Sequence, residues 1–385
     1  MKKSRSLKLI VILLSVVLLG TACTDGRVYP ANVNEIEINA KFSRAHDYTE
    51  ALQQMFGNDV YYYTIKAIDG DTLYLTQQQW QLGSEYELLT VNILAIDLQS
   101  HEIRILKSLN DGSRVGDYLV LDKDIIMQVY LPINDLDENQ VPFEIRYVKE
   151  SGETVILEKG FSQTFADTNV FSKQGDRIYY TFESLENVVD GDAQFPKHFV
   201  RSFHTLDFIE NVYETQDERE EVRSPSFSQF GSPISFVTSR WGQNYTTLHY
   251  IAENKHQTLE LKDVYNYDFV GEKGVFFDRN DGSDPYGNYY IYNFKHGKML
   301  KLERRPIALG NQMRIDENSL IQVSNVNELT MSTLTDDGVE NTRIQFDDRT
   351  PHSFDYLTKD ESQLIEVRGG IEVIILTYDL HQETH

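Results

Sequence analysis

Residues 89–106, LTVNILAIDLQSHEIRIL, decide the fold. The first run, residues 89–96, is apolar and rich in β-branched side chains, and a polar turn separates it from a second apolar run at 103–106. Two such runs about a polar turn predict a β-hairpin. Similar pairs of runs recur at residues 143–157, 198–213, 246–261, 288–302 and 328–346, and a partial copy, IEVIILTYDL, ends the series at 371–380.

These copies begin about 40–55 residues apart, and two weaker extended runs precede each pair. A period of that length with four strands per unit resembles the blades of β-propellers. The resemblance is architectural, covers roughly residues 34–380, and includes no Trp-Asp, kelch or Asp-box signature. A pair of β-sandwich or meander domains is the alternative.

The seventh copy stops after its third run, which leaves one unit a strand short. Residues 36–42, IEINAKF, alternate apolar and polar side chains as a half-buried strand does. We expect this strand to complete the last unit, because an open sheet edge invites aggregation. The prediction is an all-β, β-propeller domain over residues 34–385 with seven four-stranded blades.

One short helix is expected before the first blade, over residues 44–56. Ser43 is the expected N-cap, and Gly57 stands at the C-cap position. Ala45, Tyr48, Leu52 and Phe56 recur at helical spacing and predict one apolar side.

The N-terminus combines a basic head, MKKSRSLK, with an apolar run, LIVILLSVVLLG, and the residues LGTAC ending at Cys23. The apolar run is shorter than the roughly 20 residues that a membrane-spanning helix needs. The order of these parts resembles the lipobox signal of bacterial lipoproteins, although Gly20 stands where Leu is commoner. Residues 1–22 are therefore expected to be a signal peptide and residues 23–33 a tether. A plain secretory signal or a retained helical anchor is the alternative.

Cys23 is the only cysteine of the 385 residues, so the chain cannot form an internal disulfide. The resemblance implies a lipid, such as a palmitate-bearing diacylglycerol, on this thiol. Two acyl chains suffice for stable anchoring. We expect the protein to be held on the extracytoplasmic side of the cell membrane.

The body that would remain from Cys23 onward is strongly acidic, with 32 basic and 60 acidic residues and a net charge of −28. Such a surface repels nucleic acid and anionic headgroups. Nucleic acid is thus not an expected partner. The expected partner is a neutral, basic or cation-bridged envelope protein or glycan.

The sequence carries no catalytic motif that we identify. Gly160-Phe161-Ser162 begins a nucleophile elbow, but Thr164 occupies the position of its second glycine. Thiol catalysis is not expected, because lipidation would consume Cys23. No catalytic residue and no enzymatic activity are predicted.

Two weaker ligand candidates lie in turns. Asp278, Asp281 and Asp284 place hard oxygen ligands within seven residues, as calcium requires, although the same residues suit an ordinary turn. Calcium is the only cofactor that the sequence suggests. Arg240 and Trp241 follow an apolar strand, where the indole would stack on a sugar ring or hold a peptide, or would pack between blades.

These features predict a binding or scaffold module for an envelope protein, peptide or glycan. One alternative is an envelope hydrolase built on the same scaffold. Another is an accessory or sensor subunit of a membrane transporter or kinase.

Overall fold

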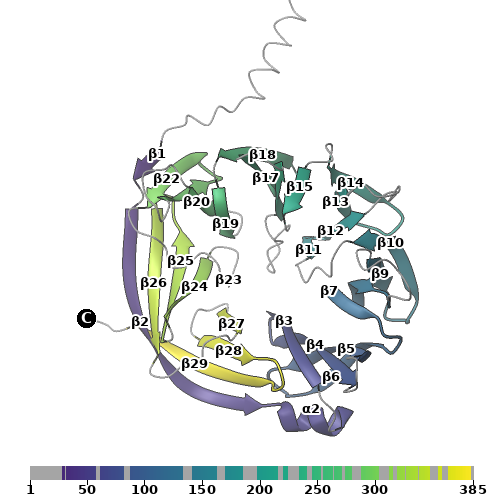
Figure 1. The fold of residues 1–385 in the computed structure, drawn as a ribbon. Coiled ribbons are helices and arrows are strands. Elements are labelled where there is room, and N and C mark those ends of the chain that lie inside the picture. Colours follow the sequence, from purple (N-terminus) through teal and green to yellow (C-terminus); the bar gives the residue numbers. More distant parts are fainter. Residues whose placement is uncertain are drawn as a thin grey trace, which may run out of the picture.

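The structure is a computed structural model. It describes residues 28–30, 32–57, 61–81, 87–132, 141–162, 170–184, 197–215, 220–223, 234–240, 245–252, 255–262, 264–270, 274–279, 288–302, 312–314, 319–325, 327–336, 338–346, 354–357 and 363–382. In these residues 29 strands and a single helix are arranged as sheets around a central axis (Figure 1). The all-β, propeller-like prediction is confirmed.

Four sheets have four strands each, and consecutive strands are neighbours within each sheet. They comprise β3 (Tyr61–Asp69), β4 (Thr72–Gln81), β5 (Glu87–Asp97) and β6 (Ile103–Leu109); β7 (Arg114–Leu121), β8 (Asp124–Tyr130), β9 (Val141–Val148) and β10 (Thr154–Ser162); β11 (Phe171–Gln174), β12 (Arg177–Ser184), β13 (Lys197–Phe203) and β14 (Ile209–Glu214); and β15 (Glu220–Arg223), β16 (Ile234–Arg240), β17 (Tyr245–Ala252) and β18 (Lys255–Lys262).

Two larger sheets complete the ring. The five-stranded sheet contains β19 (Val264–Val270), β20 (Gly274–Arg279), β21 (Asn288–Asn293), β22 (Lys298–Leu302) and β1 (Val28–Pro30). The eight-stranded sheet contains β23 (Gln312–Arg314), β24 (Ser319–Asn325), β25 (Glu328–Leu334), β26 (Gly338–Phe346), β27 (Phe354–Leu357), β28 (Gln363–Arg368), β29 (Ile374–Gln382) and β2 (Asn32–Asp47).

The hairpin predicted from residues 89–106 is β5 and β6, paired from Val91 with Leu109 to Ile96 with Ile103. Residues 91–96 of β5 are all buried. A strand covered on both faces needs a continuous apolar run, which explains why the run does not alternate. The other full copies likewise form antiparallel pairs, and the partial copy includes β29.

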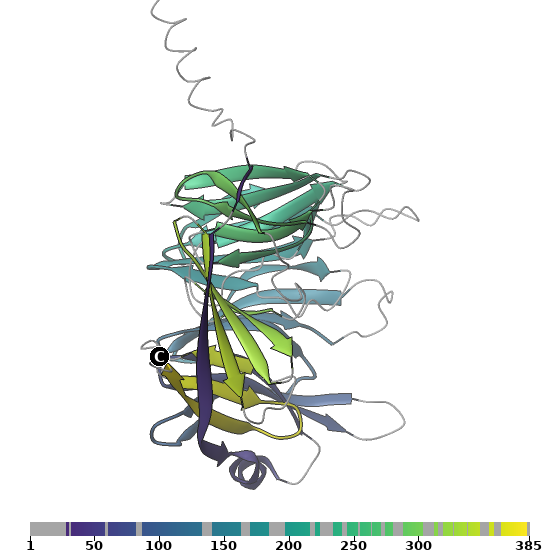
Figure 2. The same ribbon diagram turned by 90° about the vertical axis from the view of Figure 1, so that its left-hand side faces the viewer.

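The N-terminal strand completes the last sheet as predicted. β2 pairs antiparallel with β29, from Ile38 opposite Gln382 to Asp47 opposite Ile374. Its first half also pairs in parallel with β26, from Asn32 opposite Gly338 to Ala40 opposite Phe346. Figure 2 shows β2 running along the outside of both groups of strands.

The prediction of seven separate four-stranded sheets is wrong, because the structure contains six sheets and one of them has eight strands. The 16 residues of β2 are long enough to pair on both sides, and this strand joins what would otherwise be two sheets. The predicted tether is also too long. Residues 28–30 form β1, which pairs in parallel with β22.

The helix, α2, spans Thr49–Phe56 and starts later than predicted, because residues 43–47 continue β2. Its Leu52 is fully buried in a core cluster that also takes residues from β3–β5, β28 and β29. α2 therefore covers the junction between the last and the first sheets. At its end the N–H of Gly57, at φ +95°, donates to the Gln53 carbonyl at 2.8 Å, which confirms the C-cap.

Among the described residues, no helix has the length and hydropathy to cross a bilayer.

Candidate functional site

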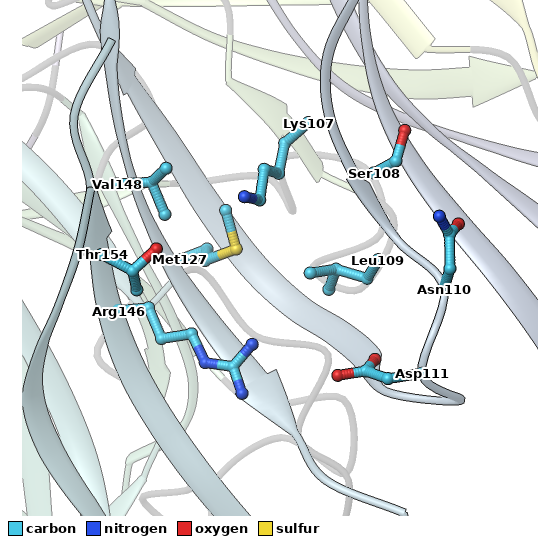
Figure 3. A pocket seen from close by; sticks show the side chains of 9 residues that line it. All are labelled: Lys107, Ser108, Leu109, Asn110, Asp111, Met127, Arg146, Val148 and Thr154. Carbon is cyan, nitrogen blue, oxygen red and sulfur yellow. The ribbon is translucent and has the colours of Figure 1, made fainter. Parts of the chain in front are cut away.

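A cavity of about 300 Å³ lies between the first two sheets (Figure 3). One wall is the end of β6 and the connection to β7, and the opposite wall is β8, β9 and the start of β10. It is lined by Lys107, Ser108, Leu109, Asn110, Asp111, Met127, Arg146, Val148 and Thr154.

Strand geometry brings the lining residues together. Arg146 and Val148 are two positions apart on β9, so they face the same side of the sheet. Met127 of β8 is directly opposite Arg146, and Thr154 of β10 is directly opposite Val148. Across the gap, Lys107 and Leu109 share one face of β6 by the same rule.

The floor of the cavity is apolar. Leu109, Met127 and Val148 have exposed fractions of 7%, 0% and 6%, and all three belong to the core cluster between the two sheets. This floor is part of the packed core, so the polar groups above it are mounted on a rigid base.

Two cationic groups point into the cavity, the Lys107 amine and the Arg146 guanidinium (Figure 3). The Arg146 Nε donates to the Glu144 Oε2 at 2.7 Å, and this pairing leaves both Nη groups directed towards the cavity. Within the described part of the chain, no carboxylate lies within 4.0 Å of the Lys107 amine. The cavity therefore presents positive charge, and the Lys107 amine and the Arg146 Nη groups are its charged hydrogen-bond donors.

Asp111 faces these cations from the connection after β6 (Figure 3). Burial acts to raise the pKa of its carboxyl, but hydrogen bonds from Ser113 and the charge of Arg146 outweigh burial and hold that pKa below its usual value. The Ser113 N–H donates to the Asp111 Oδ1 at 3.1 Å. Asp111 and Arg146 make no ion pair within 4.0 Å, so opposite charges stand apart across the cavity.

This arrangement suits recognition of charge. Guanidinium and ammonium groups bind carboxylates and phosphates through charge-assisted hydrogen bonds, and this cavity is lined by one of each. Asp111 is ionised at neutral pH because its pKa is low, so it is an acceptor and holds no proton to donate.

A second charged cluster holds the fold together. Asp117 of β7 is 4% exposed, and its carboxylate pairs with Lys66 of β3. It also accepts the backbone N–H groups of Tyr118 at 2.8 Å and of Phe171, on β11, at 3.3 Å. These contacts link the first three sheets and use the carboxylate fully.

The structure does not assemble the sites considered from the sequence. Asp278 ends up within β20, opposite Tyr289, while Asp281 and Asp284 lie outside the described residues. Arg240 is the last residue of β16, opposite Glu220, and Trp241 also lies outside the described residues. In the described residues no group of three His, Cys, Asp or Glu side chains is placed to hold a metal ion.

Cys23 and the rest of the predicted signal peptide likewise lie outside the described residues, so its lipidation stays a prediction.

Sequence reasoning missed the cavity residues. Asn110-Asp111-Gly112 reads as a turn, and Arg146 is one polar position in an alternating strand. The alternation does place Glu144 and Arg146 on one face, but the approach of β6 to that face is a contact between sheets that no local pattern encodes.

Comparison with known proteins gives no family. No protein-family model matches the chain, and no curated protein matches it. Among solved structures, an oligogalacturonate lyase in complex with manganese is 11% identical, with a TM-score of 0.38, over 81% of this chain and 86% of that one. An uncharacterized protein from Listeria monocytogenes is 9% identical, with a TM-score of 0.46, over 80% of this chain and 89% of that one.

An acylaminoacyl peptidase from Pyrococcus horikoshii is 12% identical with a TM-score of 0.48. The alignment covers 86% of this chain and 53% of the peptidase. These are similarities of architecture at low identity, and no activity is carried over from them. The propeller arrangement of this chain rests on its own strand pairing.

Proposed function

We propose that this protein is a lipid-anchored extracytoplasmic binding protein, and that it captures a small ligand bearing an anionic group between its first two sheets. The observation that carries the proposal is the presence of both Lys107 and Arg146 on the lining of one cavity. Its size, about 300 Å³, is at the lower end of the range of small-molecule sites.

Because the body is acidic, only short-range contacts inside the pocket favour an anionic ligand. The net charge of −28 repels anions at a distance, so the field of the whole protein does not steer the ligand inward. Binding then depends on direct hydrogen bonds from the two cations, and a change to either one is expected to weaken it strongly.

The anchor in this proposal is a short one. β1 begins at Val28, five residues after Cys23, and an extended chain spans at most about 3.4 Å per residue. The lipid would therefore lie within roughly 17 Å of the five-stranded sheet. A Cys23→Ala variant is expected to lose lipid labelling and to leave the membrane fraction. Retention of the variant on the membrane would contradict the anchor.

The ligand site has a separate test. Isothermal titration calorimetry of the purified mature chain with 4-methylpentanoate and with inorganic phosphate is expected to show saturable binding of at least one anion. Arg146→Gln should weaken that binding at least about tenfold, the loss of one charge-assisted hydrogen bond. Lys123→Gln is the matched control, because Lys123 lies in the turn between β7 and β8 of the same sheet, its side chain is 71% exposed, and it pairs with Glu150 outside the cavity. Equal binding by both variants would contradict the site.

We further propose that the eight-stranded sheet acts as two blades joined through β2, which would make seven blades in the ring. The hydrolase alternative has no supporting observation among the described residues.

A further inference from the structure

We propose that the ligand of the cavity between the first two sheets is a zwitterion of the amino-acid type, with a carboxylate, an ammonium group and an aliphatic side chain. This inference rests on the proposed function and specifies the ligand class. It starts from the fact that the cavity carries both signs of charge: Arg146 on the β9 wall faces Lys107 and Asp111 on the wall formed by β6 and its connection to β7.

The two cations fit the carboxylate. The Arg146 Nη groups are the part of the guanidinium that Glu144 leaves unused, and the Lys107 amine enters from β6 of the facing sheet. A planar fork with two N–H donors matches the two oxygens of a carboxylate, and an ammonium adds a third donor.

Asp111 fits the ammonium. Asp111 is ionised, and its Oδ1 is held in place by the Ser113 N–H at 3.1 Å. Its remaining acceptor positions face the cavity, with the Asn110 and Thr154 side chains also on the lining. Because Asp111 and Arg146 make no ion pair within 4.0 Å, the gap between them is available to a ligand that carries both complementary charges.

The floor fits an aliphatic side chain. Leu109, Met127 and Val148 form a surface without charge beneath the charged groups. Met is unbranched and polarizable, so Met127 adapts to the shape of an aliphatic group. A simple inorganic anion would leave this surface uncovered.

Three probes of nearly equal shape separate the contributions. L-Leucine carries both charges, 4-methylpentanoate lacks the ammonium, and 3-methylbutylamine lacks the carboxylate. Calorimetry of the purified mature chain is expected to show leucine binding at least about tenfold more tightly than either analogue, since each lost charge removes a charge-assisted hydrogen bond.

The variants assign each charge of the ligand to a residue. Asp111→Asn should weaken leucine binding about tenfold while leaving 4-methylpentanoate unchanged, and Arg146→Gln should weaken both. Lys123→Gln, with far-ultraviolet circular dichroism of every variant, controls for folding and for net charge.

The outcomes distinguish this inference from the proposed function. If 4-methylpentanoate binds as tightly as leucine, and Asp111→Asn changes neither, the zwitterion is wrong and a simple anion site stands. If leucine, 4-methylpentanoate and phosphate all fail to bind, both proposals fall.

Discussion

At the scale of single residues, Asp117 shows how the ring is tied together. β7 has a bulge between Val115 and Asp117, at Gly116, where a Cβ atom would lie 2.5 Å from the Tyr130 ring. The absence of a side chain at Gly116 permits this close packing. The Asp117 carboxylate then reaches Lys66 on the previous sheet and backbone N–H groups on the next.

Asp117→Asn is expected to lower the free energy of unfolding by about 2–4 kcal/mol, because removal of one partner leaves a largely buried charge on Lys66 and N–H groups without an anion. Urea unfolding measures this loss. Lys123→Gln breaks an exposed pair and should cost less than about 1 kcal/mol. Similar losses for the two variants would show that Asp117 does not hold the sheets together.

A histidine pair sits where β2 meets the turn between β5 and β6. The rings of His46 and His101 are 4.2 Å apart, and the Tyr48 hydroxyl lies 2.6 Å from the His101 Nδ1. Burial, followed by the charges of His101 and Arg44, lowers the pKa of His46. The folded chain therefore binds a proton at His46 less readily than the unfolded chain does.

Because the folded pKa is the lower one, the stability linked to His46 is fully present above its unfolded pKa of about 6.5 and is lost as the pH falls below that value. The melting temperature of the protein should drop between about pH 7.5 and pH 5.5, and His46→Gln should drop less. Hydrogen bonds from Ser100 lower the pKa of the nearby Asp97 carboxyl, so this group titrates below the window. An identical drop in the variant would show that His46 is not responsible.

At the scale of elements, β2 is the strand that closes the ring. Over Ile38–Ala40 it has a neighbour on each side, β26 on one and β29 on the other. Here every backbone N–H faces a partner strand, so a proline has no unpaired edge to occupy.

Asn39→Pro is expected to destabilise the fold by about 2 kcal/mol or more, since it removes a ladder hydrogen bond and restricts φ within a central strand. Asn39→Ala keeps the backbone N–H and should cost markedly less. Thermal unfolding and limited proteolysis near the C-terminus report the difference. Equal stability of the two variants would mean that the strand does not depend on this pairing.

The sequence predicts these elements where local chemistry decides them. The β5–β6 hairpin follows from its apolar runs, and the pairing of β2 with β29 follows from the strand missing in the last copy. The extent of β2 could not be read in the same way. Residues 43–47 include Ala45, the first position of the helical spacing, and it is the pairing of this segment with β29 that selects the strand.

The candidate site could not be predicted from local sequence patterns, for a related reason. Lys107 and Arg146 are 39 positions apart and belong to different sheets, so only the packing of one sheet on the next brings them together. The sequence places Arg146 within the run 143–157 and Lys107 directly after the run 89–106, which is as far as periodicity reaches.

At the scale of the whole molecule, the N-terminal segment connects the expected anchor to the ring. β1 pairs with the five-stranded sheet, and β2 then pairs with both halves of the eight-stranded sheet (Figure 1). The cavity lies between the first and second sheets, away from β1 in the ring. Lipid attachment and ligand capture would thus use different parts of one rigid body.

The most direct test of the binding account observes the cavity itself. Met127 lines the cavity, and Met331 of β25 belongs to another core cluster, so their methyl signals provide a probe and an internal reference. The mature chain is labelled with methyl-13C methionine and titrated with L-leucine, and the Met127 methyl signal is assigned from its loss in Met127→Leu. This signal should shift and saturate at millimolar ligand or below, while the Met331 methyl signal stays in place. Arg146→Gln should abolish the shift of the Met127 signal. A Met127 signal that does not move in up to about 10 mM leucine, 4-methylpentanoate or phosphate would contradict the account.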